Sequence, residues 1–149
     1  MDELTIQPFQ PADQDEVKRL VLAGLVDHWG FLDPTKNPDL NDIAATYAGG
    51  TFLVARLAGQ IVGSGALVPR GDGTAEIVRM SVACDFRRQG IGRRILHRLV
   101  VQARQDGIRQ LALETTETWQ EVIDFYLDYG FRITHFSGGD VYFALDLLD

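Results

Sequence analysis

Residues 75–96 read AEIVRMSVACDFRRQGIGRRIL and are the most informative stretch of the sequence. Alternating apolar residues predict a strand over Ala75–Ala83. The apolar repeat that follows predicts a helix from Gly90 to about Gln105. Between them, Arg87–Gly92 (Arg-Arg-Gln-Gly-Ile-Gly) places two glycines and a group of arginines where the helix begins. A helix that starts directly after such a turn is suited to binding an anion.

The turn at Arg87–Gly92 has the chemistry of a phosphate site. Unpaired N–H groups and the helix dipole favour negative charge, and glycines let a phosphate approach the backbone. The dipole contributes only about 0.3–2 kcal/mol, so several N–H donors and the arginines must act together. A P-loop needs Lys-Ser/Thr where Arg93 and Arg94 stand, and a Rossmann fingerprint needs Gly or Ala at Ile95. The alternative is a turn that only shapes the backbone.

The rest of the chain alternates between strand-like and helix-like periods, which predicts one mixed α/β domain over residues 1–149. Asp13 and Thr118 are expected to cap helices. The connection from Ala75–Ala83 to Ile108–Glu114 should be right-handed with parallel strands, whereas the hairpins make the other pairs antiparallel. Further strands are expected at residues 4–8, 51–57, 60–69, 131–136 and 141–147, and further helices at 13–25, 40–47 and 118–129.

Composition excludes several classes of protein. The net charge of −7 argues against general nucleic-acid binding, although arginines are concentrated between Arg79 and Arg98. No apolar run approaches the roughly 20 residues that cross a bilayer. An acidic N-terminus and a lone cysteine, Cys84, indicate a cytoplasmic protein. The three histidines lack metal-ligand spacing, so no metal is expected.

Residues 75–96 resemble the central acetyl-CoA-binding motif of the GNAT superfamily of N-acetyltransferases, whose Arg/Gln-x-x-Gly-x-Gly/Ala core is present at Arg87–Gly92. Residues 111–131 (LALETTETWQEVIDFYLDYGF) resemble the second family motif, with Tyr126 followed by Gly130-Phe131. One departure is Trp119, which stands where family members often have asparagine. The resemblance implies the GNAT fold: a mixed, mostly antiparallel sheet of about seven strands with a central splayed parallel pair, flanked by about four helices.

The resemblance also implies acetyl-CoA as co-substrate. Backbone groups of the strand around Ser81 would pair with the pantetheine arm, as a neighbouring strand would. Backbone amides of the turn would surround the pyrophosphate. The residues expected to bind the cofactor are Met80, Ser81, Val82, Arg87, Arg88, Gln89, Gly90, Ile91, Gly92 and Arg93.

Two residues are candidates for the catalytic groups. Glu76 is the candidate base, because an ideal strand places it on one face with Val78, Met80 and Val82, where a carboxylate is desolvated. The alternative is a solvated Glu76 at the exposed start of the strand. Tyr126 is the candidate acid toward the leaving thiolate, as the resemblance implies, and the alternative is a core tyrosine.

The acceptor is less well defined by the sequence. Trp29 and Phe31, in an irregular stretch at 28–41, are candidates for an apolar or cation–π wall, or for core residues. Glu114 and Thr115 are weaker candidates for substrate contacts. The predicted function is direct transfer of acetyl from acetyl-CoA to a primary amine in a ternary complex, without a covalent step at Cys84. The acceptor can be a small molecule, a peptide or a protein, and the resemblance admits a homodimer. The alternative is a non-catalytic acyl-CoA sensor of the same fold.

Overall fold

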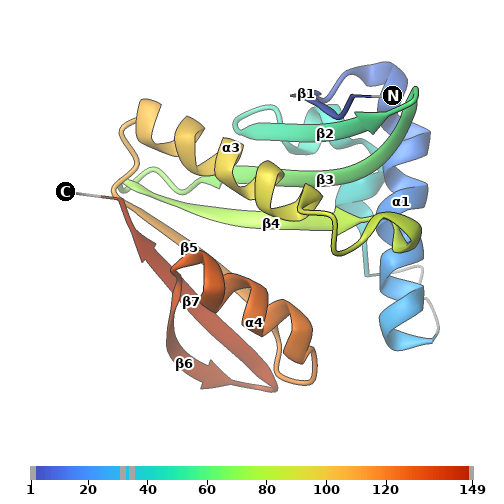
Figure 1. Ribbon diagram of the computed structural model, residues 1–149. Coiled ribbons are helices and arrows are strands. Elements are labelled where there is room, and N and C mark those ends of the chain that lie inside the picture. Colours follow the sequence, from blue (N-terminus) through green and yellow to red (C-terminus); the bar gives the residue numbers. More distant parts are fainter. Residues whose placement is uncertain (1–2, 31–32, 34–35, 148–149) are drawn as a thin grey trace.

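A mixed seven-stranded sheet with the order β1-β2-β3-β4-β5-β7-β6 organises the chain (Figure 1). The structure is a computed structural model that describes residues 3–30, 33 and 36–147. Among the residues that the structure describes, only β4 and β5 pair in parallel and the other neighbouring strands are antiparallel, which confirms the predicted fold class. The strands are β1 (Thr5–Pro8), β2 (Thr51–Leu57), β3 (Gln60–Pro69), β4 (Thr74–Val82), β5 (Gln110–Thr116), β6 (Arg132–Ser137) and β7 (Asp140–Asp146).

The helices cover the two faces of the sheet unequally. On one face α1 (Gln14–Trp29), the 3-10 turn η2 (Pro38–Asn41) and α2 (Ile43–Thr46) pack over the N-terminal strands in one apolar cluster. On the other face α3 (Ile91–Gln105) and α4 (Gln120–Tyr129) share a second cluster. The apolar stripe expected for α3 is buried there: Ile91, Ile95, Leu96, Leu99, Val100 and Ala103.

Strand β4 contains a bulge at Arg79 that reverses which side chains face which layer. Ala66 of β3 lies opposite Val78, but Ser64 lies opposite Ser81, so β4 has one extra residue. Arg79 has a φ of 54°, in the left-handed region. Val78 therefore packs with the α1 layer, whereas Met80 and Val82 pack with the α3 layer. The expectation that Glu76 shares a face with Met80 and Val82 is wrong, because that expectation assumed an ideal strand.

The two parallel strands separate soon after they meet. β4 and β5 pair only from Thr74 to Glu76 and from Gln110 to Ala112, while β5 pairs with β7 along its whole length. Beyond Glu76 the strands diverge and form a wedge between the two halves of the sheet (Figure 1). One edge of β4 is thus left without a partner strand in the middle of the sheet.

Two of the predicted helix caps are wrong. Asp13 makes no cap bond to α1; it accepts the backbone N–H of Gln10 at 3.0 Å and pairs with Arg56. Helix α4 begins at Gln120, so its N-cap residue is Trp119 and not Thr118. No side chain caps this helix, and the expected capping box of Thr118 and Glu121 therefore does not form. Helix α1 also continues past Leu25 to Trp29, where Gly30 ends it with a φ of 78°.

Candidate active site

The turn before α3 presents free backbone N–H groups. Arg88 and Gly90 have φ values of 65° and 81°, and no side chain caps the helix. The first intrahelical bond runs from the Arg94 N–H to the Gly90 carbonyl at 3.1 Å. The N–H groups of the first turn, from Ile91 to Arg93, consequently have no intrahelical acceptor and carry the positive end of the helix dipole. Free N–H groups at the start of a helix can bind an anion.

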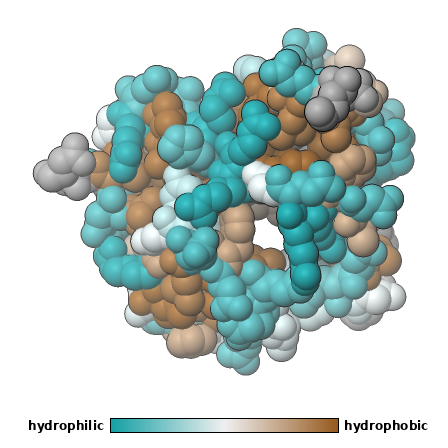
Figure 2. Space-filling model, in the orientation of Figure 1, coloured by the Kyte–Doolittle hydropathy of each residue, from teal (hydrophilic) through white to brown (hydrophobic). Residues whose placement is uncertain are grey.

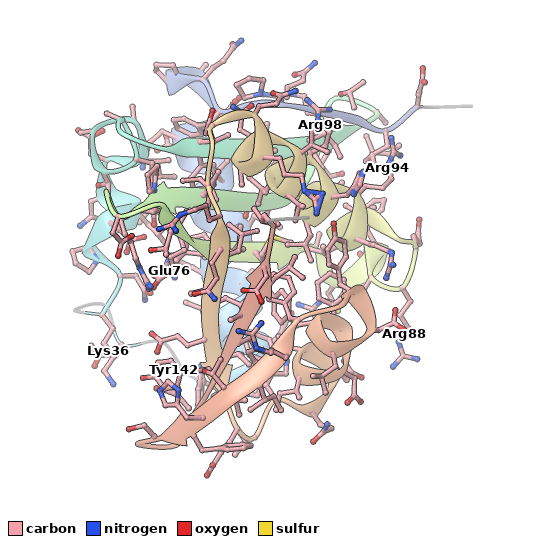
Figure 3. The ribbon with its side chains drawn as sticks, turned by 90° about the vertical axis from the view of Figure 1, so that its left-hand side faces the viewer. Lys36, Glu76, Arg88, Arg94, Arg98 and Tyr142 are labelled. Atoms are coloured by element: carbon pink, nitrogen blue, oxygen red, sulfur yellow. The ribbon has the colours of Figure 1, made fainter. Side chains whose placement is uncertain are left out.

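The arginines of the turn are tied to acids on neighbouring helices. Arg88 pairs with Glu121 of α4 at 3.0 Å, and Arg93 pairs with Asp128 at the same distance. Arg87 donates to the Val82 carbonyl at 3.1 Å and lies 3.6 Å from Asp27. These pairs join α3 and its turn to α4 and α1. The side chains of Arg88, Arg94 and Arg98 lie on the α3 side of the sheet (Figure 3).

The unpaired edge of β4 leads away from this turn into the wedge. Met80, Ser81 and Val82 are half-buried, and their strand has β3 on one side and no strand on the other. An extended amide-containing chain can pair with such an edge as an added strand does. The Val82 carbonyl, however, already accepts from Arg87. The space-filling surface is deeply hollowed between the two halves of the sheet (Figure 2).

Tyr126 lies on the buried side of α4, and its ring packs against the rings of Phe125, Phe131 and Phe143 with centroids 5.1–5.8 Å apart. Only 6% of the residue is exposed. Burial raises the pKa of its hydroxyl above the ordinary value, so the O–H stays protonated at neutral pH. The neighbouring residue Phe125 reaches the turn before α3, because a Cβ on Gly92 would lie 3.6 Å from the Phe125 ring.

Glu76 lies on the opposite side of the sheet from the arginines, together with Tyr142 (Figure 3). Its carboxylate pairs with Arg70, and 32% of its side chain is exposed. The carboxylate is therefore partnered and partly hydrated, in contrast to the desolvated position expected from the sequence.

A polar cluster fixes the bulge of β4, and no local sequence pattern predicts it. Arg79 donates to both carboxylate oxygens of Asp39, at 2.8 and 2.7 Å, and the Tyr47 hydroxyl donates to the same carboxylate at 2.7 Å. Burial alone would raise the pKa of Asp39, but these hydrogen bonds outweigh it and hold the pKa below its ordinary value. Burial and the neighbouring Asp39 raise the pKa of Tyr47 to about 12.

Glu114 belongs to a second cluster on the sheet face away from α4. It lies directly across from Tyr142 in the β5–β7 register and is exposed, whereas Thr115 is half-buried. A hydrogen bond with Glu114 raises the pKa of Tyr142. The His135 ring stacks on Tyr142 at 4.3 Å. Sequence reasoning missed Tyr142 and His135, because only the strand register brings them to Glu114.

The ends of α1 and α4 meet across the mouth of the wedge. The His28 ring stacks on Trp119 with centroids 4.1 Å apart and planes at 12°, and it meets Trp29 edge to face at 4.6 Å. Trp29 is 49% exposed on the last turn of α1, not in a loop. Phe31, the other expected wall residue, lies outside the described residues. A cavity of about 410 Å³ lies beside the stack, lined by Gly24, Asp27, His28, Arg87, Thr118, Trp119, Gln120 and Glu121.

Within the part of the chain that the structure describes, no group of three or more His, Cys, Asp and Glu side chains could hold a metal ion. Over the same residues, none of the helices has both the length and the apolar character to cross a membrane. Cys84 is exposed in the short turn after β4.

Comparison with known proteins agrees with this geometry. The model of the acetyltransferase (GNAT) family matches residues 16–131, which is most of the chain. The chain belongs to the GNAT family of acetyltransferases. Membership of this family makes the chain an acyltransferase.

Several named acetyltransferases and a synthetase are about one-third identical to this GNAT enzyme over the aligned residues. An IAA acetyltransferase from Azospirillum brasilense is 35% identical over 133 residues, covering 88% of this chain and 86% of the relative. N-acetyltransferase 8F1 of Rattus norvegicus is 33% identical over 64% of this chain. The chain spans only 47% of that rat protein and 38% of the N-acetylaspartate synthetase of Danio rerio, which is 36% identical over 106 residues.

Solved structures share the fold at lower identity. A GNAT acetyltransferase from Staphylococcus aureus superposes with a TM-score of 0.90 at 20% identity, over 98% of this chain and 100% of the other. The PaiA N-acetyltransferase of Thermoplasma acidophilum, solved with coenzyme A, gives a TM-score of 0.85 at 17% identity over 97% and 99% of the two chains.

Proposed function

We propose that this GNAT enzyme is a cytoplasmic N-acetyltransferase that moves acetyl directly from acetyl-CoA to a primary amine in a ternary complex. One observation carries the proposal. The unpaired edge of β4 leads from the uncapped start of α3 into a wedge that reaches the middle of the sheet. An elongated molecule with a diphosphate at one end and an amide-containing arm at the other matches this shape.

The cofactor would be held mainly by backbone groups. N–H groups from Arg88 to Arg93 would bind the diphosphate, and the β4 edge at Met80–Val82 would pair with the arm. The arginine side chains already have acidic partners, so their part is to hold the turn in shape and to balance charge. When bound, acetyl-CoA supplies the acyl group as a thioester.

The acceptor amine must lose a proton. A lysine-like amine has a pKa of about 10.4, so deprotonation at pH 7 costs about 4.6 kcal/mol, from 3.4 units at 1.36 kcal/mol each. Glu76 is the proposed base. Because its carboxylate is paired with Arg70 on the α2 side of the sheet, it would take the proton through a water molecule.

Tyr126 is the proposed acid. Its hydroxyl stays protonated because the side chain is buried, and it belongs to the helix that flanks the wedge. It would give its proton to the sulfur as the carbon–sulfur bond breaks and the carbon–nitrogen bond forms. The amine loses one proton and the sulfur gains one, so the products are an amide and a thiol.

The acceptor is proposed to contact Glu114, Thr115 and Trp29.

The test is release of coenzyme A from acetyl-CoA in the presence of a panel of amines, for wild type, Glu76→Gln and Tyr126→Phe. Loss of a general acid or base should reduce amine-dependent turnover by about 100-fold or more. Tyr129→Phe removes a hydroxyl one turn further along the same helix and serves as the matched control. Binding of acetyl-CoA without turnover on any amine would support the alternative, a sensor module. Unchanged rates in both variants would reject the catalytic assignments.

A further inference from the structure

The bulge in β4 lies directly before the open edge of that strand. Between the register pairs on either side of the bulge, Arg79 and Met80 stand against the single residue Gly65 of β3. A Cβ on Gly65 would lie 2.5 Å from Met80 Sδ, so the Met80 side chain fills the space that a larger residue would need. The extra residue is thus accommodated at the start of the edge formed by Met80–Val82.

The bulge decides which peptide groups of β4 face the wedge. The Ala83 N–H donates to the Val62 carbonyl of β3 at 2.8 Å, so the Val82 carbonyl of the same trans peptide points the other way, to the open edge. Backbone groups alternate in direction along a strand, so those of Met80 point the same way as those of Val82. With one residue fewer, Met80 would take the place of Ser81 and turn its groups to β3.

The backbone needs support to keep this bulge. Arg79 has a φ of 54°, a conformation that residues other than glycine rarely adopt. Such a conformation persists only when the surroundings impose it. One support comes from within the sheet, because the fully buried Ser64 hydroxyl donates to the Arg79 carbonyl at 2.8 Å.

The second support comes from the segment at 37–47, on the α1 face of the sheet. The Arg79 guanidinium donates to both carboxylate oxygens of Asp39, at 2.8 and 2.7 Å, and to Asn37 Oδ1 at 3.1 Å. The Tyr47 hydroxyl donates to the same carboxylate at 2.7 Å. Only 20% of the Arg79 side chain and 23% of the Asp39 side chain are exposed. A two-pronged bond of this kind fixes the orientation of the guanidinium as well as its position.

We infer that Arg79 is a positioning residue for acyl transfer. Its bonds to Asp39 hold the bulge in place, and the bulge turns the peptide groups of Met80 and Val82 toward the open edge. A ligand with an amide-containing arm gains from this arrangement, whereas a ligand that binds only at the turn before α3 does not. The inference rests on the proposed placement of the cofactor, and the test measures that placement separately.

The test compares the affinities of coenzyme A and ADP by calorimetry. ADP has the diphosphate but lacks the arm, so the ratio of the two affinities measures what the β4 edge contributes. Two double variants share Asp39→Asn, which removes the charged partner, and differ in carrying Arg79→Gly or Arg79→Ala. Glycine adopts a positive φ without support, whereas alanine does not. We expect the glycine variant to keep the wild-type ratio and the alanine variant to lower it by about 5- to 10-fold, through weaker binding of coenzyme A alone.

Asp13→Asn is the matched control. It weakens another shielded ion pair, between Asp13 and Arg56 of β2, which lies two places from β4 in the sheet. This variant should lower the midpoint of thermal unfolding and leave the ratio unchanged. Equal ratios in the glycine and alanine variants, or a fall of the same size in Asp13→Asn, would overturn the inference and leave the proposed function standing. Equal affinities of the wild type for coenzyme A and ADP would instead reject the proposed placement of the cofactor.

Discussion

Two arginines adopt left-handed backbone conformations next to the candidate active site. Arg79 has a φ of 54° at the bulge, and Arg88 has a φ of 65° in the phosphate turn. Such conformations cost a non-glycine residue of the order of 1–3 kcal/mol and persist only when the surroundings impose them. At Arg79 the bonds to Asp39 compensate for this cost, and at Arg88 the pair with Glu121 is exposed and contributes little.

Gly90 allows a test that separates backbone strain from ligand binding. Gly90 and Gly107 have φ values of 81° and 78°, and a Cβ at either would meet no atom within 4 Å. Alanine at either position should cost about 1–2 kcal/mol of unfolding free energy, measured by denaturant titration. Only Gly90→Ala should also weaken coenzyme A binding, measured by calorimetry, since Gly107 lies at the far end of α3. Equal affinities in the two variants would contradict the placement of the phosphate.

Tyr47 predicts a change in stability at alkaline pH. Its pKa is raised from 10.0 to about 12 in the folded protein, so the folded state holds the proton more tightly than the unfolded state. The stabilisation is complete below about pH 10 and is lost as the pH rises toward 12. Wild type should therefore lose unfolding free energy over this interval relative to Tyr47→Phe, which cannot ionise. Parallel curves for the two proteins between pH 9 and 12 would disprove the shift.

Among the elements, the contact between α3 and β3 depends on glycines. A Cβ on Gly65 would lie 2.5 Å from Met80 Sδ and 2.8 Å from Ile95 Cγ2. Gly65→Ala should thus force α3 away from the sheet and cost about 1–3 kcal/mol. Gly49→Ala, where a Cβ would meet nothing within 4 Å, is the control. Thermal unfolding of both variants checks this, and an unchanged midpoint in Gly65→Ala would show that the helix shifts freely.

How far the sequence predicts each element depends on whether its cause is local. The hairpin of Thr51–Leu57 and Gln60–Pro69 and the helix to Gln105 were predicted at their observed bounds within a residue, because turn residues and apolar repeats are local signals. The bulge at Arg79 could not be predicted, since it depends on pairing with β3 and on contacts with Asp39, 40 residues away.

The candidate site follows the same division. The glycine turn at Arg87–Gly92 could be predicted from the sequence, because its conformation and its free amide groups depend on only a few neighbouring residues. The Arg70 partner of Glu76 lies in a neighbouring loop, and the stack of His28 on Trp119 joins helices that only the tertiary fold brings together. The turn could therefore be predicted from local sequence. The sheet face on which Glu76 lies could not, because it depends on the register between β3 and β4.

For the molecule as a whole, ligand binding should stabilise the folded state by connecting the two halves of the sheet. β4 and β5 meet over three register pairs, so a cofactor in the wedge would add contacts between the two halves of the sheet. Acetyl-CoA at about 100 times its Kd should stabilise the fold by about 2.7 kcal/mol. For a chain of this size that corresponds to a rise of roughly 5–11 °C in Tm. Thermal melts with and without acetyl-CoA check this, and adenosine alone, which lacks the arm and the diphosphate, should give a much smaller shift.

The divergence of β4 from β5 leaves a free strand edge inside the sheet and not at its rim. A strand edge with free N–H and C=O groups on the rim of a sheet can recruit a strand from another molecule and so begin aggregation. Here the unpaired edge of β4 lies inside the sheet, with α3 and α4 on one side and the end of α1 on the other. A slender extended arm can reach it, but the broad edge of a second folded sheet cannot. The same opening that admits an extended arm is thus closed to the edge of a second folded sheet.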